Sequence, residues 1–144
     1  MKRHEALAPL SRDHHGSLIL AQLLKKGAPA YKGLPVDDAG KASYAIRQFE
    51  QHIKDHFQQE EEMLEMINTR HKEIERLGKE IRDEHVLLEA LFYSLGNSAS
   101  LQDTMDELGS KLDAHIRKEE RELFPLLQQY CSENELQQIH HLLH

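Results

Sequence analysis

The chain has 144 residues, a formal net charge of −7 and a single cysteine. The negative charge argues against non-specific binding to nucleic acid or to an anionic membrane, and no apolar run approaches the length of a membrane span. Charged residues make up 30%, aromatic residues 6%, and Trp is absent, which favours an all-α fold with a charged surface over an all-β fold. We expect one domain over residues 1–144, with a core at about 10–131.

The lone cysteine, Cys131, excludes an internal disulfide and suits a reducing compartment. The start of the chain, from Met1 to Glu5, leads into no signal-peptide core. These two features predict a cytoplasmic protein in which Cys131 is an inert residue near a helix end.

The first helix is predicted to begin at Ser11, as N-cap, and to run to about Lys26, before Gly27. Two adjacent histidines compete for its inner face. His14 shares a helical face with apolar residues, whereas the face of His15 is partly polar. We therefore expect His14 to point inward and His15 to lie at the rim.

The second helix is predicted to begin after Asp37 or Asp38 and to run to about Ile67. Its apolar seam advances in steps of three and four residues, as in a helix packed along a bundle axis. A histidine and a glutamate interrupt the seam at core positions. The seam is Ile46, Phe49, Ile53, His56, Glu60, Met63 and Ile67.

After a turn near Asn68 and Thr69, a third helix is predicted to end near Gly96. A fourth begins after Ser100 and is bent at Pro125. Both carry apolar seams that a histidine interrupts. The seams are Ile74, Gly78, Ile81, His85, Leu88, Phe92 and Leu95, and then Leu101, Met105, Leu108, Leu112, His115 and Glu119.

A capping box of Ser132 and Glu135 predicts a short last helix. Four long helices with short connections predict an antiparallel up-down four-helix bundle with a short C-terminal helix. With a rise of about 1.5 Å per residue, the seam histidines of the last three long helices fall near one level along the bundle. A histidine near the start of the first helix falls toward the same region.

The spacing His-x-x-x-Glu places an imidazole and a carboxylate on one helical face, a ligand mix that suits non-haem iron. The spacing alone is weak evidence, because it occurs four times in a chain with 11 histidines. In only two of the four copies do both the histidine and the glutamate lie in an apolar seam. An unpartnered buried polar group costs about 1–3 kcal/mol, and two metal ions would satisfy all the inward groups. The candidate ligands are His14, His56, Glu60, His85, His115 and Glu119.

Other polar residues are expected outside this set. His52 lies one step off the seam and is expected beside the site, and Glu89 is left open as an additional ligand. His71 lies too far along its helix to join. Two groups are expected at the surface: Glu61, Glu62 and Glu120, which are solvated or orient a histidine, and His140, His141 and His144 near the C-terminus.

These segments together resemble the hemerythrin-like, or HHE cation-binding, family over about residues 10–130. The resemblance implies two non-haem iron ions, oxo- or hydroxo-bridged. Glu60 and Glu119 would also bridge them, and the four histidines would be terminal ligands. The segments are Asp13-His14, His56-x-x-x-Glu60-Glu61, Glu84-His85 and His115-x-x-x-Glu119-Glu120-x-x-Leu123-Phe124-Pro125.

Two positions depart from the oxygen-carrying members of that family. Those proteins have a second histidine one turn away on the third helix, where this chain has Ile81 and Glu89. Their fourth-helix carboxylate is an Asp five residues after the histidine, where this chain has Glu120; the four-residue spacing favours Glu119. The resemblance therefore implies binding of O2 or another small diatomic or peroxide ligand, or sensing of oxygen or iron, rather than simple oxygen carriage.

Two alternatives stay open from the sequence. One is a diiron oxidase or peroxidase-type enzyme, although ferritin-like sites use Glu-x-x-His rather than His-x-x-x-Glu. The other is a bundle that holds another metal such as Zn²⁺ and acts through an unidentified protein partner. The pattern favours a binding or sensing module over an enzyme.

Overall fold

The computed structural model describes residues 2–67 and 71–144, and within them the chain forms helices and no strand, as expected. The turn predicted at Asn68 and Thr69 lies outside the described residues. The elements are α1 (Ala8–Leu24), α2 (Asp38–Gln48), η1 (Phe49–Ile53), α3 (Lys54–Ile67), α4 (Lys72–Ser94), α5 (Leu101–Lys118), η2 (Glu119–Leu123), α6 (Phe124–Tyr130) and α7 (Glu133–Leu143).

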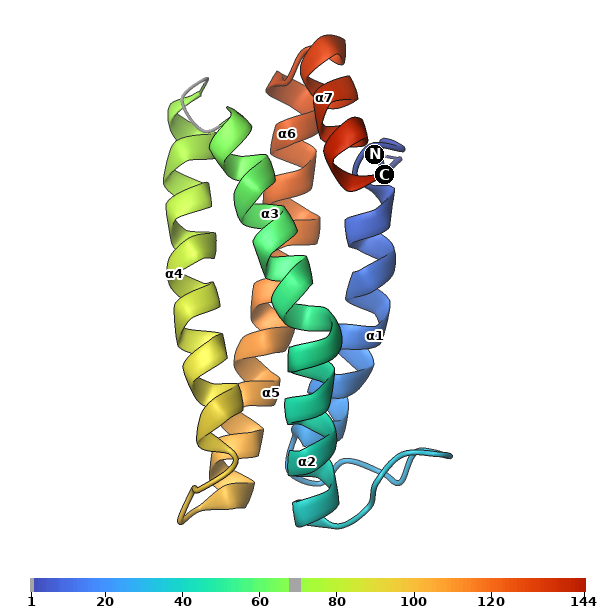
Figure 1. The fold of residues 1–144 in the computed structure, drawn as a ribbon, viewed down its shortest axis with the longest axis vertical. Coiled ribbons are helices and arrows are strands. Elements are labelled where there is room, and N and C mark those ends of the chain that lie inside the picture. Colours follow the sequence, from blue (N-terminus) through green and yellow to red (C-terminus); the bar gives the residue numbers. More distant parts are fainter. Residues whose placement is uncertain (1, 68–70) are drawn as a thin grey trace.

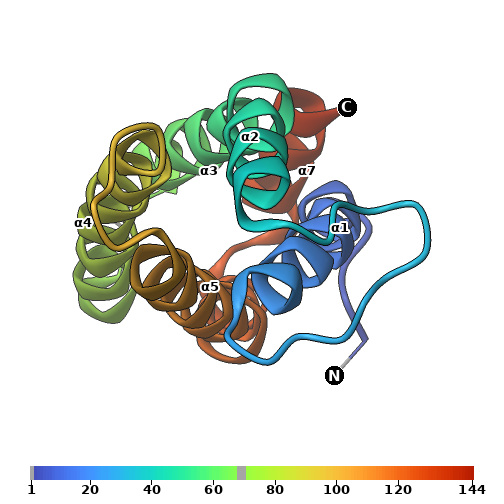
Figure 2. The same ribbon diagram turned by 90° about the horizontal axis from the view of Figure 1, so that it is seen from below.

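The long helices lie side by side along the longest axis (Figure 1). In that view α1 descends, α2 continues through η1 into α3 and rises, α4 descends, and α5 continues through η2 into α6 and rises. Seen from below, α4 lies between α2 and α5, and α5 lies between α4 and α1 (Figure 2). The short α7 packs against α3. Each long helix therefore has two neighbours and one inward face.

The first helix begins earlier than predicted. It starts at Ala8 with Leu7 as N-cap, so Ser11 lies inside the helix and is not its cap. Pro9 fits the first turn because the backbone N–H that it lacks would have no helical partner there. The Ser11 hydroxyl is therefore free to donate a hydrogen bond to Glu120, 2.9 Å away.

Two helix ends form as expected. The Asp37 side chain accepts a hydrogen bond from the backbone N–H of Gly40 at the start of α2. Ser132 and Glu135 form both hydrogen bonds of the capping box that begins α7.

The second and fourth predicted helices each contain a π-helical turn that the sequence did not reveal. The turn η1 ends three residues before His56, and η2 begins at Glu119. In η2 the Phe124 N–H bonds to the Glu119 carbonyl, five residues back, just before Pro125. A proline ring crowds the carbonyl four residues before it in a regular α-helix, so a wider turn is favoured at this place. The π-helical turn thus lies just before Pro125, the residue at which the sequence predicts a bend.

The core consists of two apolar clusters separated by a polar layer. One cluster fills the end formed by α2, the start of α5 and the end of α4. The other fills the end formed by the start of α4, the end of α3, α6 and α7. Nearly all predicted seam residues are buried, but Ile46 and Leu101 are only half-buried. The long helical segments are called rods from here on: α1, α2 with η1 and α3, α4, and α5 with η2 and α6. In the rod that begins with α2, Ala45 takes the inner position near the start.

No helix among the described residues is both long enough and apolar enough to cross a membrane.

Gly109 is required where α1 and α5 approach closely. A Cβ there would lie 2.6 Å from the Ala21 carbonyl oxygen, whereas a Cβ at Gly16 meets no described atom within 4 Å. We expect Gly109→Ala to destabilise the protein by about 1–3 kcal/mol because backbone atoms must shift. Gly16→Ala should be neutral or stabilising by up to about 1 kcal/mol.

Thermal unfolding of the two alanine variants measures this difference. A Gly109→Ala protein that melts at the wild-type temperature would contradict the close approach of the two helices.

Candidate metal centre

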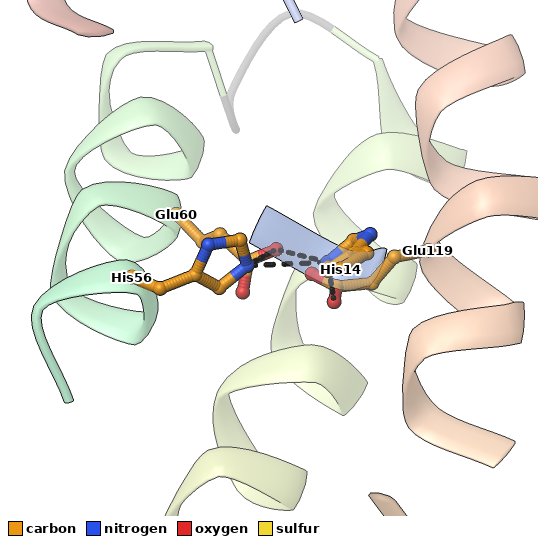
Figure 3. Close-up of side chains that lie close together, drawn as sticks. All are labelled: His14, His56, Glu60 and Glu119. Carbon is orange, nitrogen blue, oxygen red and sulfur yellow. Dashed lines mark hydrogen bonds and ion pairs between the residues drawn. The ribbon is translucent and has the colours of Figure 1, made fainter. Parts of the chain in front are cut away.

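The six predicted ligands meet in the polar layer between the two apolar clusters. Glu60 and Glu119 are 0% exposed, and the four histidines are 2–7% exposed. Each rod contributes at least one ligand. His14 comes from α1, while His56 and Glu60 come from α3, one helical turn apart. His85 comes from α4 and His115 from α5. Figure 3 shows four of the six side chains pointing toward one another. Glu119 opens the turn η2, directly after the helix that carries His115.

The side chains form two groups that share both carboxylates. One group is His14, His56, Glu60 and Glu119, and the other is Glu60, His85, His115 and Glu119; within each, the facing atoms lie within 4.8 Å of one another. Glu60 divides its two oxygens between the groups. Its Oε1 lies 3.0 Å from His85 Nε2, and its Oε2 lies 3.2 Å from His56 Nε2.

The spacing of these atoms fits donors around a shared cation. Donor atoms about 2.1 Å from one ion lie about 3.0–3.4 Å from each other in octahedral or tetrahedral arrangements. The two Nε2 atoms of His14 and His56 are 3.1 Å apart, and Glu119 Oε1 lies 3.1 Å from His14 Nε2. It also lies 3.3 Å from His115 Nε2.

Several of these atoms are close together without being aligned for hydrogen bonds. In the described part of the chain, Glu60 Oε2, His115 Nε2 and both oxygens of Glu119 are buried and lack a partner in hydrogen-bonding geometry. Such groups are costly in an apolar interior unless something else satisfies them. The donor set and its spacing therefore fit a metal site.

The buried carboxylates also shift the pKa values of their neighbours. Burial alone lowers the pKa of His56, but the Glu60 charge and a bond to Asp13 outweigh it and raise the pKa to about 9. Burial likewise lowers the pKa of His115 and His14, and carboxylates around them raise it to about 10 and about 12. Burial raises the pKa of Glu60, but His56 and the other partners hold it well below its usual value. The carboxylates thus favour protonated imidazoles around them. The protons supply positive charge at the place where a bound cation would supply it.

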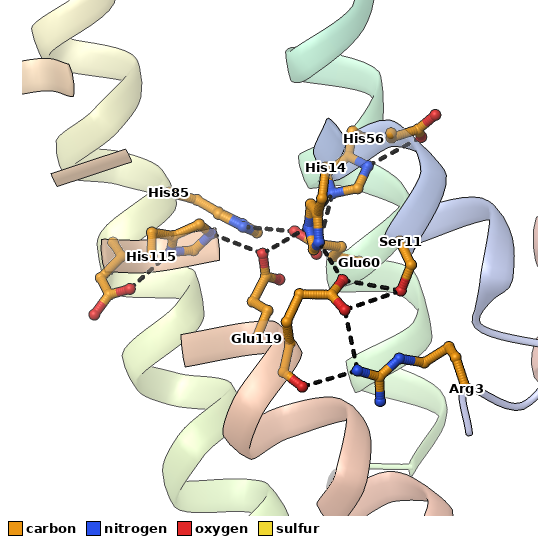
Figure 4. A network of polar contacts seen from close by, with 11 residues as sticks. Arg3, Ser11, His14, His56, Glu60, His85, His115 and Glu119 are labelled. Atoms are coloured by element: carbon orange, nitrogen blue, oxygen red, sulfur yellow. Dashed lines mark hydrogen bonds and ion pairs between the residues drawn. The ribbon is translucent and has the colours of Figure 1, made fainter. Parts of the chain in front are cut away.

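The outer nitrogen of each histidine donates to a carboxylate on a neighbouring rod, and Figure 4 shows this contact for His14, His56 and His115. His85 Nδ1 lies 2.8 Å from Glu61, and His14 Nδ1 lies 2.6 Å from Glu120, so these two glutamates orient histidines as the sequence suggested. Glu62 instead accepts a bond from Gln58 at the surface.

Two further orienting carboxylates were missed in the sequence. Asp13 accepts a bond from His56 Nδ1 at 3.1 Å, and Glu84 accepts one from His115 Nδ1 at 2.7 Å. Each directly precedes a candidate ligand, which is the signal that could have identified it.

Aromatic rings also hold two of the imidazoles. Phe57 stacks on His85 with ring centroids 3.9 Å apart, and Phe124 stacks on His14 at 5.6 Å. These stacking contacts restrict the rotation of the two imidazole rings.

The remaining candidates lie outside both groups. His15 is exposed, and Glu89 is half-buried beside His85. His52 is exposed and lines a surface cavity that His56 also lines, so it lies beside the site without joining either group. His71 donates to the Tyr130 carbonyl. Near the C-terminus, His140 and His144 stack on each other.

Comparison with protein-family models matches residues 5–127 to the hemerythrin HHE cation binding domain. Searches among curated proteins and among solved structures found no match.

The raised histidine pKa values predict how the stability of chelator-treated protein depends on pH. A folded-state pKa above the ordinary value of 6.5 stabilises the fold fully below pH 6.5, and this contribution is lost as pH rises through about 9 for His56 and about 10 for His115. We expect the melting temperature to fall by about 5–10 °C between pH 7 and 9.5.

Calorimetry across this range measures the fall, and the His56→Gln variant should show a smaller one. A melting temperature that stays constant or rises over the range would contradict this electrostatic assignment.

Proposed function

The chain belongs to the hemerythrin HHE cation-binding family, and we propose that it holds two non-haem iron ions, oxo- or hydroxo-bridged, and binds O2 or a related small ligand. The ligands we propose are His14 and His56 for one ion and His85 and His115 for the other, with Glu60 and Glu119 shared. The observation that carries this proposal is the sharing of both buried carboxylates between two histidine pairs.

The division of Glu60 supports two ions rather than one. Its oxygens face histidines of different groups, so one carboxylate can serve two cations without moving. Glu119 lies within 3.3 Å of a histidine from each group through its Oε1 atom. Imidazole and carboxylate donors in such numbers suit iron, and two histidines with a carboxylate are a common non-haem iron set.

The donor count leaves room for a small ligand. Each group offers two imidazoles and two shared carboxylates, fewer donors than an octahedral ion takes. One turn from His85, the buried Ile81 and the half-buried Glu89 stand where carriers in this family have a further histidine. Ferrous ions held by these residues would supply electrons and a binding place for O2, NO or peroxide. Because the donor atoms are buried, a large ligand would not reach them without displacing the surrounding side chains.

The protein's own groups have four roles in this function. The carboxylates hold charge at the site, the imidazoles give up their inner protons when a cation binds, and the two apolar clusters exclude water from either side. The bond from each outer nitrogen keeps the inner nitrogen directed at the site.

We further propose that the arrangement is a single-domain antiparallel up-down four-helix bundle and that the protein is cytoplasmic. The reversal of direction between consecutive rods and the match over residues 5–127 support the first part. The net charge of −7 disfavours nucleic acid as a partner.

Anaerobic titration with Fe(II) tests the number of ions. We expect about two irons per chain for the wild type and loss of at least half of them in His56→Ala and Glu119→Ala, because each variant removes a donor. The matched control is His15→Ala, next to His14 but exposed, which should bind iron like the wild type.

One tetrahedral Zn²⁺ in place of iron, or no iron at all, would contradict the diiron proposal. If His15→Ala loses iron and His14→Ala keeps it, the assignment of the first helix is wrong.

Exposure of the Fe(II) protein to air separates a binding module from an enzyme. We expect absorption changes that reverse when O2 is removed, because the buried site admits the ligand but little water. Rapid irreversible oxidation with turnover of peroxide would instead support the oxidase or peroxidase alternative.

A further inference from the structure

We propose that Asp13, Glu61, Glu84 and Glu120 form a closed ring of positioning residues that sets all four imidazoles before a metal ion arrives. Each carboxylate belongs to one rod and holds the histidine of the next rod around the bundle. This inference rests on the proposed metal-binding function, and it assigns a role to four residues outside the ligand set.

The contacts close on themselves. Asp13 of α1 holds His56 of α3, and Glu61 of α3 holds His85 of α4. From α4, Glu84 holds the histidine of α5. Glu120, which follows α5 on the same rod, returns to the histidine of α1 at 2.6 Å. Four bonds of 2.6–3.1 Å thus connect every rod to both of its neighbours.

Helix geometry explains why the ring closes. Successive residues on a helix point about 100° apart, so the neighbour of an inward residue points toward an adjacent helix. On the two rods that descend in Figure 1, the carboxylate precedes the inward histidine, as in Asp13-His14 and Glu84-His85. On the two that rise, it follows the inward glutamate, as Glu61 follows Glu60.

One step back on a descending right-handed helix and one step forward on a rising one turn in the same sense when both are viewed from the same end. All four carboxylates therefore reach around the bundle in one direction, and the last reaches the first rod. If the carboxylates instead reached in different directions, two rods could hold each other's histidines and no closed ring would form. The common direction of reach is therefore a specific property of these four positions.

Two members of the ring are themselves held in place. Lys118 donates to Glu84, while Arg3 and Ser11 donate to Glu120, and the side chains of these glutamates are 29% and 27% exposed. The other two are more open, with Asp13 55% and Glu61 45% exposed. In the structure each histidine pair has one imidazole on an anchored carboxylate and one on an open carboxylate.

A carboxylate can only accept a hydrogen bond, so each bond fixes a proton on Nδ1 and turns Nε2 toward the centre. It also gives the imidazole a stronger partner than water or an amide would, because the acceptor is charged. We expect each carboxylate to strengthen metal binding through its histidine without touching the metal.

The test compares neutral variants of ring members with neutral variants of adjacent carboxylates outside the ring. Glu84→Gln is paired with Asp83→Asn, and Glu61→Gln with Glu62→Gln, since Asp83 accepts from Lys79 and Glu62 from Gln58 at the surface. Fe(II) affinity is measured by chelator competition. Ring variants should lose about 10- to 100-fold, and the paired controls less than about two-fold.

A second readout is independent of metal binding. In ¹⁵N NMR of chelator-treated protein, the Nδ1–H signals of His115 and His85 should move and exchange faster with water in Glu84→Gln and Glu61→Gln respectively, and stay unchanged in the controls.

Ring variants with wild-type affinity and unmoved Nδ1–H signals would overturn the inference. If the wild type binds no iron but the ring variants still show the NMR changes, the proposed function is overturned and the ring of positioning residues is supported. Iron affinity lost equally in controls and ring variants would show a general charge effect and also overturn the ring.

Discussion

The structure depends on two carboxylates, Glu60 and Glu119, that are fully buried at the centre of the helices. A carboxylate removed from water is costly unless positive charge or hydrogen bonds replace its hydration. Four imidazoles surround this pair, and the pKa values of His14, His56 and His115 are raised because the carboxylates hold their protons. Protons and metal cations are therefore alternative ways to satisfy the same charge, and the site is built to take either.

This constraint also orders the rest of the fold. The polar layer divides the interior into two apolar clusters, and each cluster fixes one end of the long helices. The helices must bring their histidines to one level, because a shift of one turn would bury a carboxylate against apolar side chains. The π turns lie beside ligand positions on two rods, where they adjust the rotation of the helix near His56 and at Glu119. The outer carboxylates then connect each rod to the next.

The sequence predicted the helices and all six inward polar residues because an apolar seam with a three-and-four period is a local property. The choice of His14 over His15 followed from the same pattern, and the structure buries the first and exposes the second. The roles of Asp13 and Glu84 do not follow from the seam pattern, because neither residue lies in a seam; their only local signal is that each directly precedes a candidate ligand. The predicted start of the first helix at Ser11 is wrong, because a serine is a common N-cap, whereas the helix starts at Ala8 with Pro9 tolerated in its first turn.

The most direct test of the central claim is the position of iron in crystals of the Fe(II)-loaded protein, measured by anomalous diffraction at the iron edge. The account predicts two anomalous peaks within the polar layer, one beside His14 and His56 and the other beside His85 and His115, with Glu60 between them. A single peak, or iron at the C-terminal histidines with none in the polar layer, would contradict it.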